Sequence, residues 1–150
     1  MSAQNELYQA VILDHNRNPR NYSKLEDATH SAEGFNPLCG DHLWVYLHID
    51  STEKIVNITF EGDGCAISKA SASLMTTALL GKGLDEAAQM IKEFQQLVKG
   101  ELNPEVDEHC LGKLKIFSGI WRYPSRVKCA NLAWHAVKGA MNNNKSVTTE

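Results

Sequence analysis

The sequence has few of the features that mark nucleic-acid-binding, membrane and secreted proteins. Its net charge is −3 and its pI about 6.1, which argues against the strongly basic face of a nucleic-acid binder. No apolar run reaches the length of a membrane span, and residues 1–6 lack the basic and apolar regions of a secretory signal. We therefore expect a cytoplasmic protein without nucleic-acid or membrane partners, whose cysteines are reduced thiols or metal ligands.

Cysteine is also scarce, because the chain has four and none of them forms a Cys-x-x-Cys pair. Structural zinc sites usually use such pairs, so any metal site here must take ligands from separate segments. The chain has 150 residues, of which 43% are hydrophobic and 22% charged, and it shows no internal repeat. It suits one domain, spanning residues 1–150, with a core of its own.

The run Asn-Pro-Leu-Cys-Gly-Asp at 36–41 sets a thiol and a carboxylate two residues apart. Gly40 permits a tight turn that can aim Cys39 and Asp41 at one point. Two later cysteines are each expected at the start of a helix. Cys65 follows a glycine-rich elbow, and Cys129 follows a basic flank. We expect the fold to bring these four residues together.

Three thiols and a carboxylate match a four-coordinate zinc site in number and type. Their excess negative charge needs cationic neighbours, and Arg126 and Lys128 lie beside Cys129. Positive charge and a helix N-terminus also lower the pKa of a thiol and favour the reactive thiolate. The oxygen ligand, Asp41, is less suited than a fourth thiolate to soft metals, which indicates a site that exchanges what it holds.

Hydrophobic periodicity predicts one helix before a β-hairpin and four helices after it. In the hairpin, Leu43, Val45, Leu47 and Ile49 share one face of the first strand, and Val56, Ile58 and Phe60 share one face of the second. We expect helices at 5–15, 68–80, 84–98, 105–117 and 129–141, strands at 42–50 and 54–61, an edge strand near 29–33, and a frayed tail at 142–150. The hairpin would place Cys39 and Asp41 beside Cys65.

Other residues offer competing interpretations. Cys110 lies in an amphipathic segment without a glycine elbow or basic flank, which favours a structural role, although His109-Cys110 is a rival for the third ligand position. His42 and His48 lie on the aromatic face of a strand, where we expect them to pack rather than to bind a metal. His135 follows Cys129 by six residues, near the opposite face of one helix, which disfavours a catalytic Cys/His pair. The zinc deaminase pattern is absent.

Several motifs together resemble one family. They are Leu-Tyr-Gln-Ala-Val-Ile-Leu-Asp-His at 7–15 with Asn-Pro-Arg-Asn at 18–21, Pro-Leu-Cys-Gly-Asp at 37–41, Gly-Asp-Gly-Cys-Ala-Ile-Ser-Lys-Ala-Ser-Ala-Ser at 62–73, and Arg-Val-Lys-Cys-Ala at 126–130. The chain is similar, from about residue 7 to 141, to the U-type iron–sulfur scaffolds: IscU, SufU and the NifU N-terminal domain. The resemblance implies an α+β fold, SufE/NifU-like, with a small antiparallel sheet of about three strands and helices on one face. It also implies that Cys39, Asp41, Cys65 and Cys129 surround a metal or cluster.

Three departures resemble the SufU branch. Lys128 stands where the IscU branch has a histidine, residues 123–128 replace its Leu-Pro-Pro-Val-Lys segment, and residues 101–121 form an additional stretch. For this branch the resemblance implies a bacterial, zinc-bound protein without independent catalysis. It would accept persulfide sulfur from a SufS-type cysteine desulfurase and pass it to the SufBCD machinery. By analogy with the family, Cys39 is the expected acceptor, with Cys65 and Cys129 as alternatives.

Two other function classes share the same residues. In a cluster scaffold like IscU, the three cysteines and Asp41 would hold a transient [2Fe–2S] unit. In a zinc-stabilised binding domain, the metal would only fasten the fold. Metal analysis and an absorption spectrum of anaerobically purified protein would separate these classes.

Overall fold

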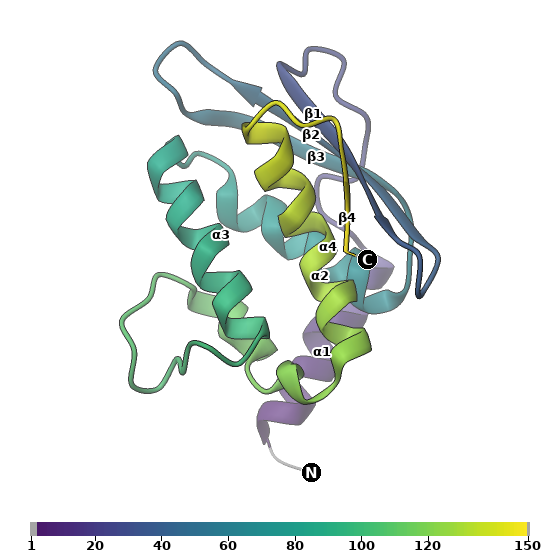
Figure 1. The fold of residues 1–150 in the computed structure, drawn as a ribbon, viewed down its shortest axis with the longest axis vertical. Coiled ribbons are helices and arrows are strands. Elements are labelled where there is room, and N and C mark those ends of the chain that lie inside the picture. Colours follow the sequence, from purple (N-terminus) through teal and green to yellow (C-terminus); the bar gives the residue numbers. More distant parts are fainter. Residues whose placement is uncertain (1–2, 150) are drawn as a thin grey trace.

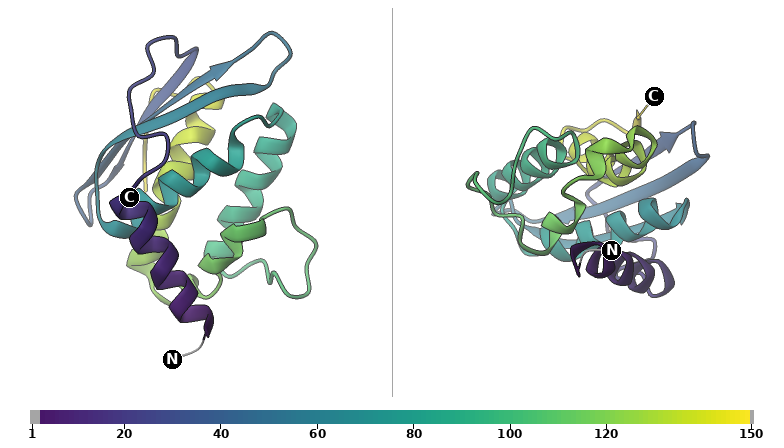
Figure 2. Two further views of the ribbon diagram at one scale, coloured as in Figure 1. Left: turned by 180° about the vertical axis from the view of Figure 1, so that it is seen from behind. Right: turned by 90° about the horizontal axis from the view of Figure 1, so that it is seen from below.

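The computed structural model describes residues 3–149 and has an α+β architecture. In chain order its elements are α1 (Ala3–Arg17), β1 (His30–Asn36), β2 (Asp41–Ile49), β3 (Ile55–Asp63), α2 (Ala66–Leu79), α3 (Leu84–Val98), the 3-10 helices η1 (Gly112–Phe117) and η2 (Ile120–Arg122), α4 (Pro124–Met141) and β4 (Ser146–Thr148). The strands form a sheet with the helices gathered on one face, as Figures 1 and 2 show. The predicted fold class is confirmed. Within residues 3–149, no helix is long and apolar enough to cross a membrane.

The sheet has four strands, in the order β3-β2-β1-β4, rather than the expected three. β1, β2 and β3 are antiparallel neighbours, whereas β4 runs parallel to β1. The prediction of a frayed C-terminal tail is therefore wrong for residues 146–148. Val147 lies against Gly34 and Gly139; a side chain at Gly139 would collide with Val147, whereas one at Gly34 would crowd Leu132 of α4. The absence of a side chain at Gly139 therefore makes room for the last strand.

The hairpin of β2 and β3 supplies the inner layer of the core. Leu43, Val45 and Leu47 alternate as predicted and are completely buried. The prediction that Val56 shares a face with Ile58 and Phe60 is wrong, because a register shift between His48 and Ile49 turns Ile55 inward and leaves Val56 48% exposed. A bulge of this kind breaks the strict two-residue period on which the prediction depended.

Helix α2 lies between α1 and α4, and it also contacts β3. Its small side chains allow this close approach, as the Ala- and Ser-rich sequence suggested. Ser71 is fully buried, and its hydroxyl donates to the carbonyl of Ala130 at 2.7 Å and accepts from the indole N–H of Trp134 at 3.1 Å. The first turns of α2 and the middle of α4 are thereby held together, which brings the segments of two cysteines close to each other.

The segment between α3 and α4 is not the helix predicted at 105–117. Residues 101–111 are an irregular loop, and the helical part is the six-residue 3-10 helix η1. Asn103 donates from its backbone to the Asp107 carboxylate at 2.8 Å, and Gly112 has a φ of +53°. These turns interrupt an α-helix. The apolar positions were nevertheless read correctly, since Leu111, Leu114 and Phe117 are buried.

Candidate metal centre

Cys39, Asp41 and Cys129 converge on one point. One ligand atom from each residue lies within 4.8 Å of the other two. Cys39 comes from the turn before β2, Asp41 is the first residue of β2, and Cys129 lies on α4. Asp41 and Cys129 are buried, whereas Cys39 is exposed. The structure thus brings together three of the four residues that the sequence selected, with the thiol of Cys39 at the surface.

The turn before β2 aims the first two residues. The N–H of Cys39 donates to the carbonyl of Asn36 at 3.2 Å, and Gly40 has a φ of +73°, a conformation that favours glycine. Asp41 then enters the sheet opposite Asn36. The expectation that Gly40 lets the thiol and the carboxylate face one point is consistent with this geometry.

The Asp41 carboxylate is fixed by three donors. Its Oδ1 accepts the backbone N–H of Cys65 at 2.9 Å, and its Oδ2 accepts the Ser68 hydroxyl at 2.6 Å and the Asn36 amide at 3.0 Å. A buried carboxylate needs such partners, and an ionised one has about four acceptor positions. One position therefore remains for a metal ion after the protein has oriented the group.

Sequence reasoning missed Asn36 and Ser68, both of which are completely buried. The Asn36 amide also reaches the sulfur of Cys129 at 3.5 Å, so one side chain contacts both Asp41 and Cys129. The only signal in the sequence is position, since Asn36 precedes the Pro-Leu-Cys-Gly-Asp run and Ser68 follows Cys65 by one helical turn. Polar side chains beside metal ligands typically orient them and tune their affinity.

Cys65 adjoins this group but lies outside the 4.8 Å set. It is the N-cap of α2, and its sulfur accepts the backbone N–H of Ser68 at 3.4 Å. The hairpin ends meet as predicted, because His42 pairs with Asp63 and the Cys65 N–H binds Asp41. Cys65 is therefore anchored to the centre through its backbone while its sulfur caps the helix.

The position of Cys129 differs from the prediction. Helix α4 begins at Pro124, a residue that suits the first helical position, so Cys129 is the sixth residue of the helix and not its start. The favourable effect of a helix N-terminus falls off within the first turn. That effect applies to Cys65 but not to Cys129.

Cys65 and Cys129 shift each other's pKa in opposite directions. A hydrogen bond from the Cys129 thiol, followed by those from Ser68, lowers the pKa of Cys65 to about 6. The same bond to Cys65, together with burial and the bond to Cys39, raises the pKa of Cys129. The sulfurs of Cys129 and Cys39 are 3.5 Å apart. Without a metal ion, Cys65 therefore ionises more readily than Cys129.

The two cations of the basic flank are placed differently from each other. The Arg126 side chain is exposed, and its guanidinium lies over the Tyr123 ring at 4.5 Å. Lys128 is half-buried, one residue before Cys129. Within residues 3–149, neither forms an ion pair with Asp41. Arg126 and Lys128 can therefore offset the negative charge of the centre only by longer-range electrostatic attraction.

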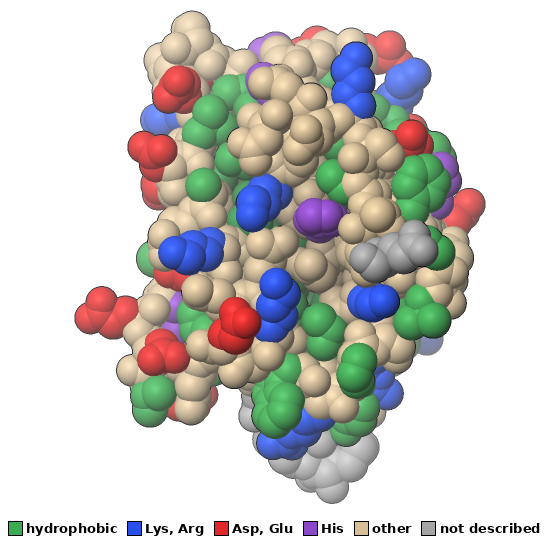
Figure 3. All heavy atoms as spheres, viewed as in Figure 1, with side chains coloured by type: hydrophobic (Ala, Val, Ile, Leu, Met, Phe, Trp, Pro, Cys, Tyr) green, Lys and Arg blue, Asp and Glu red, His purple; other side chains and the backbone are tan. Residues whose placement is uncertain are grey.

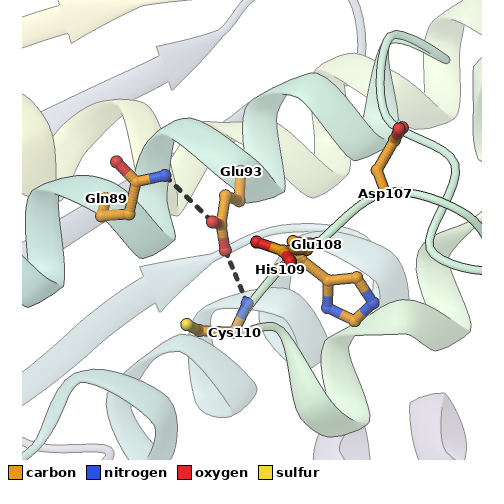
Figure 4. Close-up of a pocket in the computed structure, with 6 residues that line it drawn as sticks. All are labelled: Gln89, Glu93, Asp107, Glu108, His109 and Cys110. Carbon is orange, nitrogen blue, oxygen red and sulfur yellow. Dashed lines mark hydrogen bonds between the residues drawn. The ribbon is translucent and has the colours of Figure 1, made fainter.

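The rival pair His109-Cys110 lies in a separate pocket with Glu93, as Figure 4 shows. The N–H of Leu111 donates to Nδ1 of His109 at 3.1 Å, which leaves the proton on Nε2, where it donates to the carbonyl of Pro104 at 3.0 Å. Both ring nitrogens are used. The sulfur of Cys110 and the ring of His109 point to opposite sides. This geometry offers no ligand pair.

The histidines of β2 are engaged in packing and pairing. The His42 ring stacks on Trp44 with 4.0 Å between centroids, and its Nε2 is 2.9 Å from the Glu33 carboxylate. His48 pairs with Asp27 at 3.2 Å. Neither belongs to the converging group.

Comparison with known proteins identifies the family. Residues 7–130 match the model of the NifU-like N terminal domain. The chain belongs to this family. The domain in this chain is 39% identical over 141 residues to the "Iron-sulfur cluster assembly scaffold protein IscU" of Streptococcus pyogenes serotype M1, which covers 94% of this chain and 86% of that protein. It is also 39% identical over 133 residues to the "Zinc-dependent sulfurtransferase SufU" of Bacillus subtilis, which covers 88% of this chain and 87% of that protein.

Solved structures agree with this assignment. The NifU-like domain superposes with a TM-score of 0.82 and 36% identity on a SufU scaffold protein from Fervidobacterium islandicum AW-1, over 91% of this chain and 97% of that one. It also shares its fold, at 22% identity and a TM-score of 0.81, with a NifU-like N-terminal protein from Brucella abortus. The chain thus belongs with the IscU, SufU and NifU N-terminal-domain proteins of iron–sulfur cluster assembly, as the sequence motifs indicated.

Proposed function

We propose that this chain is a SufU-type sulfur acceptor, which takes persulfide sulfur from a SufS-type cysteine desulfurase and delivers it to a SufBCD-type assembly complex. The observation that supports this best is the uneven burial of the centre. The Cys39 thiol is exposed, while the neighbouring Asp41 and Cys129 are buried. A sulfur donor on another protein can therefore approach Cys39 and no other member of the converging group.

The donor set fits zinc, with Cys39, Asp41 and Cys129 as ligands and Cys65 as the fourth. Zinc binds thiolate and carboxylate ligands in tetrahedral sites, and Asp41 keeps an acceptor position free once its three hydrogen bonds are counted. When bound, the metal would keep these thiols deprotonated. Asn36 and Ser68 hold the carboxylate in place for this role.

The chemistry of transfer falls on Cys39. Its thiolate attacks the terminal sulfur of the persulfide on the desulfurase cysteine. The sulfur–sulfur bond of the donor breaks, its electron pair leaves with the desulfurase cysteine as a thiolate, and a new sulfur–sulfur bond forms on Cys39. No external oxidant or reductant is needed. Asn36, hydrogen bonded to Asp41 and Cys129, keeps the buried part of the centre in place during the exchange.

Mass spectrometry after incubation with desulfurase and cysteine tests this proposal. We expect one added sulfur atom on the peptide that contains Cys39. The variant Asp41→Ala alters the metal site but spares every thiol, so it should change desulfurase stimulation while all four thiols remain titratable. Sulfur confined to Cys110, or absent from every cysteine while the desulfurase turns over, would contradict the acceptor role.

A cluster scaffold is the second candidate function. The same three sulfurs and one carboxylate are a donor set for a transient [2Fe–2S] unit, and the IscU relative is as similar to this chain as the SufU relative, at 39% identity each. Metal analysis and an absorption spectrum of anaerobically purified protein separate the two. One zinc per chain and no visible absorption support the acceptor; iron, sulfide and a visible band support the scaffold.

A further inference from the structure

The C-terminal part of this chain carries an excess of positive charge. Between Cys110 and Thr149 there are seven Lys or Arg residues and no Asp or Glu, although the whole chain has a net charge of −3. Five of the seven belong to residues 113–128, which form the 3-10 helices and the first turns of α4. Figure 3 shows basic side chains over α4 and around its lower end, and acidic ones beside the loop after α3 and along the upper edge of the molecule.

A groove of about 740 Å³ opens at this basic end, between η2, the loop after α3 and the start of α1. One wall consists of Trp121, Arg122, Tyr123 and Arg126. Trp121 is 49% exposed and Tyr123 is 51% exposed. Trp, Tyr and Arg are the residues enriched at the energetic centres of protein interfaces. We call these four residues the aromatic–arginine wall.

The two arginines of the aromatic–arginine wall are already ordered by stacking. The Arg122 guanidinium is 5.3 Å from the centroid of the Trp121 ring, and the Arg126 guanidinium is 4.5 Å from that of Tyr123. Within residues 3–149, neither arginine forms an ion pair with a carboxylate of this chain. A stacked guanidinium has lost part of its side-chain freedom and can still bind a carboxylate in bidentate fashion.

The groove adjoins the metal centre. Arg126 lies one helical turn before Cys129, and Tyr8 of α1 lines the same groove. Burial raises the pKa of Tyr8, Arg126 opposes this rise, and the neighbouring Cys65 and Cys129 add to it less strongly. A protein bound along the aromatic–arginine wall would therefore also cover the edge of the centre.

We propose that this groove binds an acidic segment of the sulfur-donating desulfurase, an inference that rests on the proposed function and names the surface it uses. Carboxylates complement the two stacked arginines, and the half-exposed rings supply apolar contact area. A nucleic acid fits less well, because Glu105 lines the same groove and would repel a continuous polyanion. A peptide can place its carboxylates on the arginine wall alone.

The test uses Arg122→Glu, which reverses one charge on the aromatic–arginine wall without touching a proposed metal ligand. We expect the concentration of this protein that gives half-maximal desulfurase stimulation to rise about tenfold, equivalent to about 1.4 kcal/mol, as for an interface residue whose truncation costs more than about 1 kcal/mol. The maximal rate and the zinc content should not change, and sulfur should still reach Cys39. Lys138→Glu is the matched control, since it makes the same charge reversal at an exposed position near the other end of α4.

Direct binding separates this inference from the proposed function. Calorimetry with the desulfurase, without cysteine, should show a tenfold loss of binding affinity for Arg122→Glu and no loss for Lys138→Glu. If Arg122→Glu, Lys138→Glu and the unaltered protein bind and stimulate equally, the docking surface is wrong even though sulfur reaches Cys39. If sulfur transfer fails but the binding difference persists, the surface stands and the acceptor role falls. Oligonucleotide binding that Arg122→Glu abolishes would assign the groove to nucleic acid instead.

Discussion

Two places in this molecule combine cysteine with a buried carboxylate. They differ in the groups that lie around the carboxylate oxygens. Asp41 is 2% exposed and has two cysteine sulfurs within 4.8 Å. Glu93 is 6% exposed, and its two oxygens accept the N–H of Cys110 at 2.8 Å and the amide of Gln89 at 2.9 Å. The first arrangement gathers ligand atoms, whereas the second closes a loop against a helix. Residue types alone do not distinguish them.

Removal of metal should give the largest difference between the metal centre and the Glu93–Cys110 contact. The proposed ligands come from the turn before β2, the start of α2 and the middle of α4, so a bound zinc ties these segments together. Saturation at about a thousand times Kd adds about 4 kcal/mol to the free energy of unfolding, equivalent to about 10 °C in a chain of this size. We expect chelation to lower the melting temperature by that amount. An unchanged melting curve after verified zinc removal would show that the fold is independent of the centre.

Asn36→Ala tests whether the centre depends on its buried amide. The substitution removes the hydrogen bonds to Asp41 and Cys129, and we expect it to cost about 1–3 kcal/mol of stability. Zinc affinity should fall by about 10- to 100-fold, as is typical for partners of metal ligands. Competition with a chromogenic chelator measures this affinity. Asn57→Ala, on an exposed part of β3, is the control and should change neither quantity.

Glu93→Gln should act on the other place alone. The amide keeps one acceptor, but its N–H₂ group then faces either the N–H of Cys110 or the amide of Gln89. We expect a loss of about 1–2 kcal/mol in urea unfolding and faster proteolysis within residues 101–111. Zinc content should equal that of the unaltered protein. A loss of zinc would mean that the two places are coupled.

The difference in pKa between Cys65 and Cys129 predicts how the metal-free protein reacts with an alkylating agent. Cys65 has its pKa lowered to about 6, so its thiolate predominates above that pH, whereas the pKa of Cys129 is raised. Alkylation at pH 7 should therefore label Cys65 well before Cys129, and the rate at Cys65 should fall as the pH is lowered through about 6. Peptide mass spectrometry follows each site. Equal rates at Cys65 and Cys129 would contradict this difference in pKa.

The sequence predicted the parts of the fold that follow a simple period. The burial of Leu43, Val45 and Leu47 and the bounds of α3 are as expected. It failed where tertiary contacts override the period, as at Val56 after the register shift, and in the loop at 101–111. β4 escaped prediction because its order depends on pairing with β1, which is distant in the sequence, and on the space left at Gly139.

Only the reactive residues of the candidate site could be predicted from the sequence. Cysteine and aspartate can be selected by type, and the hairpin topology places Cys65 beside Asp41. Asn36 and Ser68 could not be selected, because an amide and a hydroxyl are common and their role depends on burial against Asp41. The distance between Cys39 and Cys129, 90 residues apart, likewise depends on how α4 packs over β1 and β2.

Cys110→Ser should have the smallest effect, and it sharpens the contrast between the two cysteine-bearing places. The side chain of Cys110 is exposed, and the contact that holds its segment is made by its backbone N–H, which serine retains. We expect a change in stability within about 0.5 kcal/mol and an unchanged zinc content. Cys129→Ser, the same substitution at a buried sulfur, is the comparison and should lower zinc content clearly. If Cys110→Ser lost zinc instead, ligation would have to involve the loop at 101–111, and the division between a metal centre and a structural loop would fail.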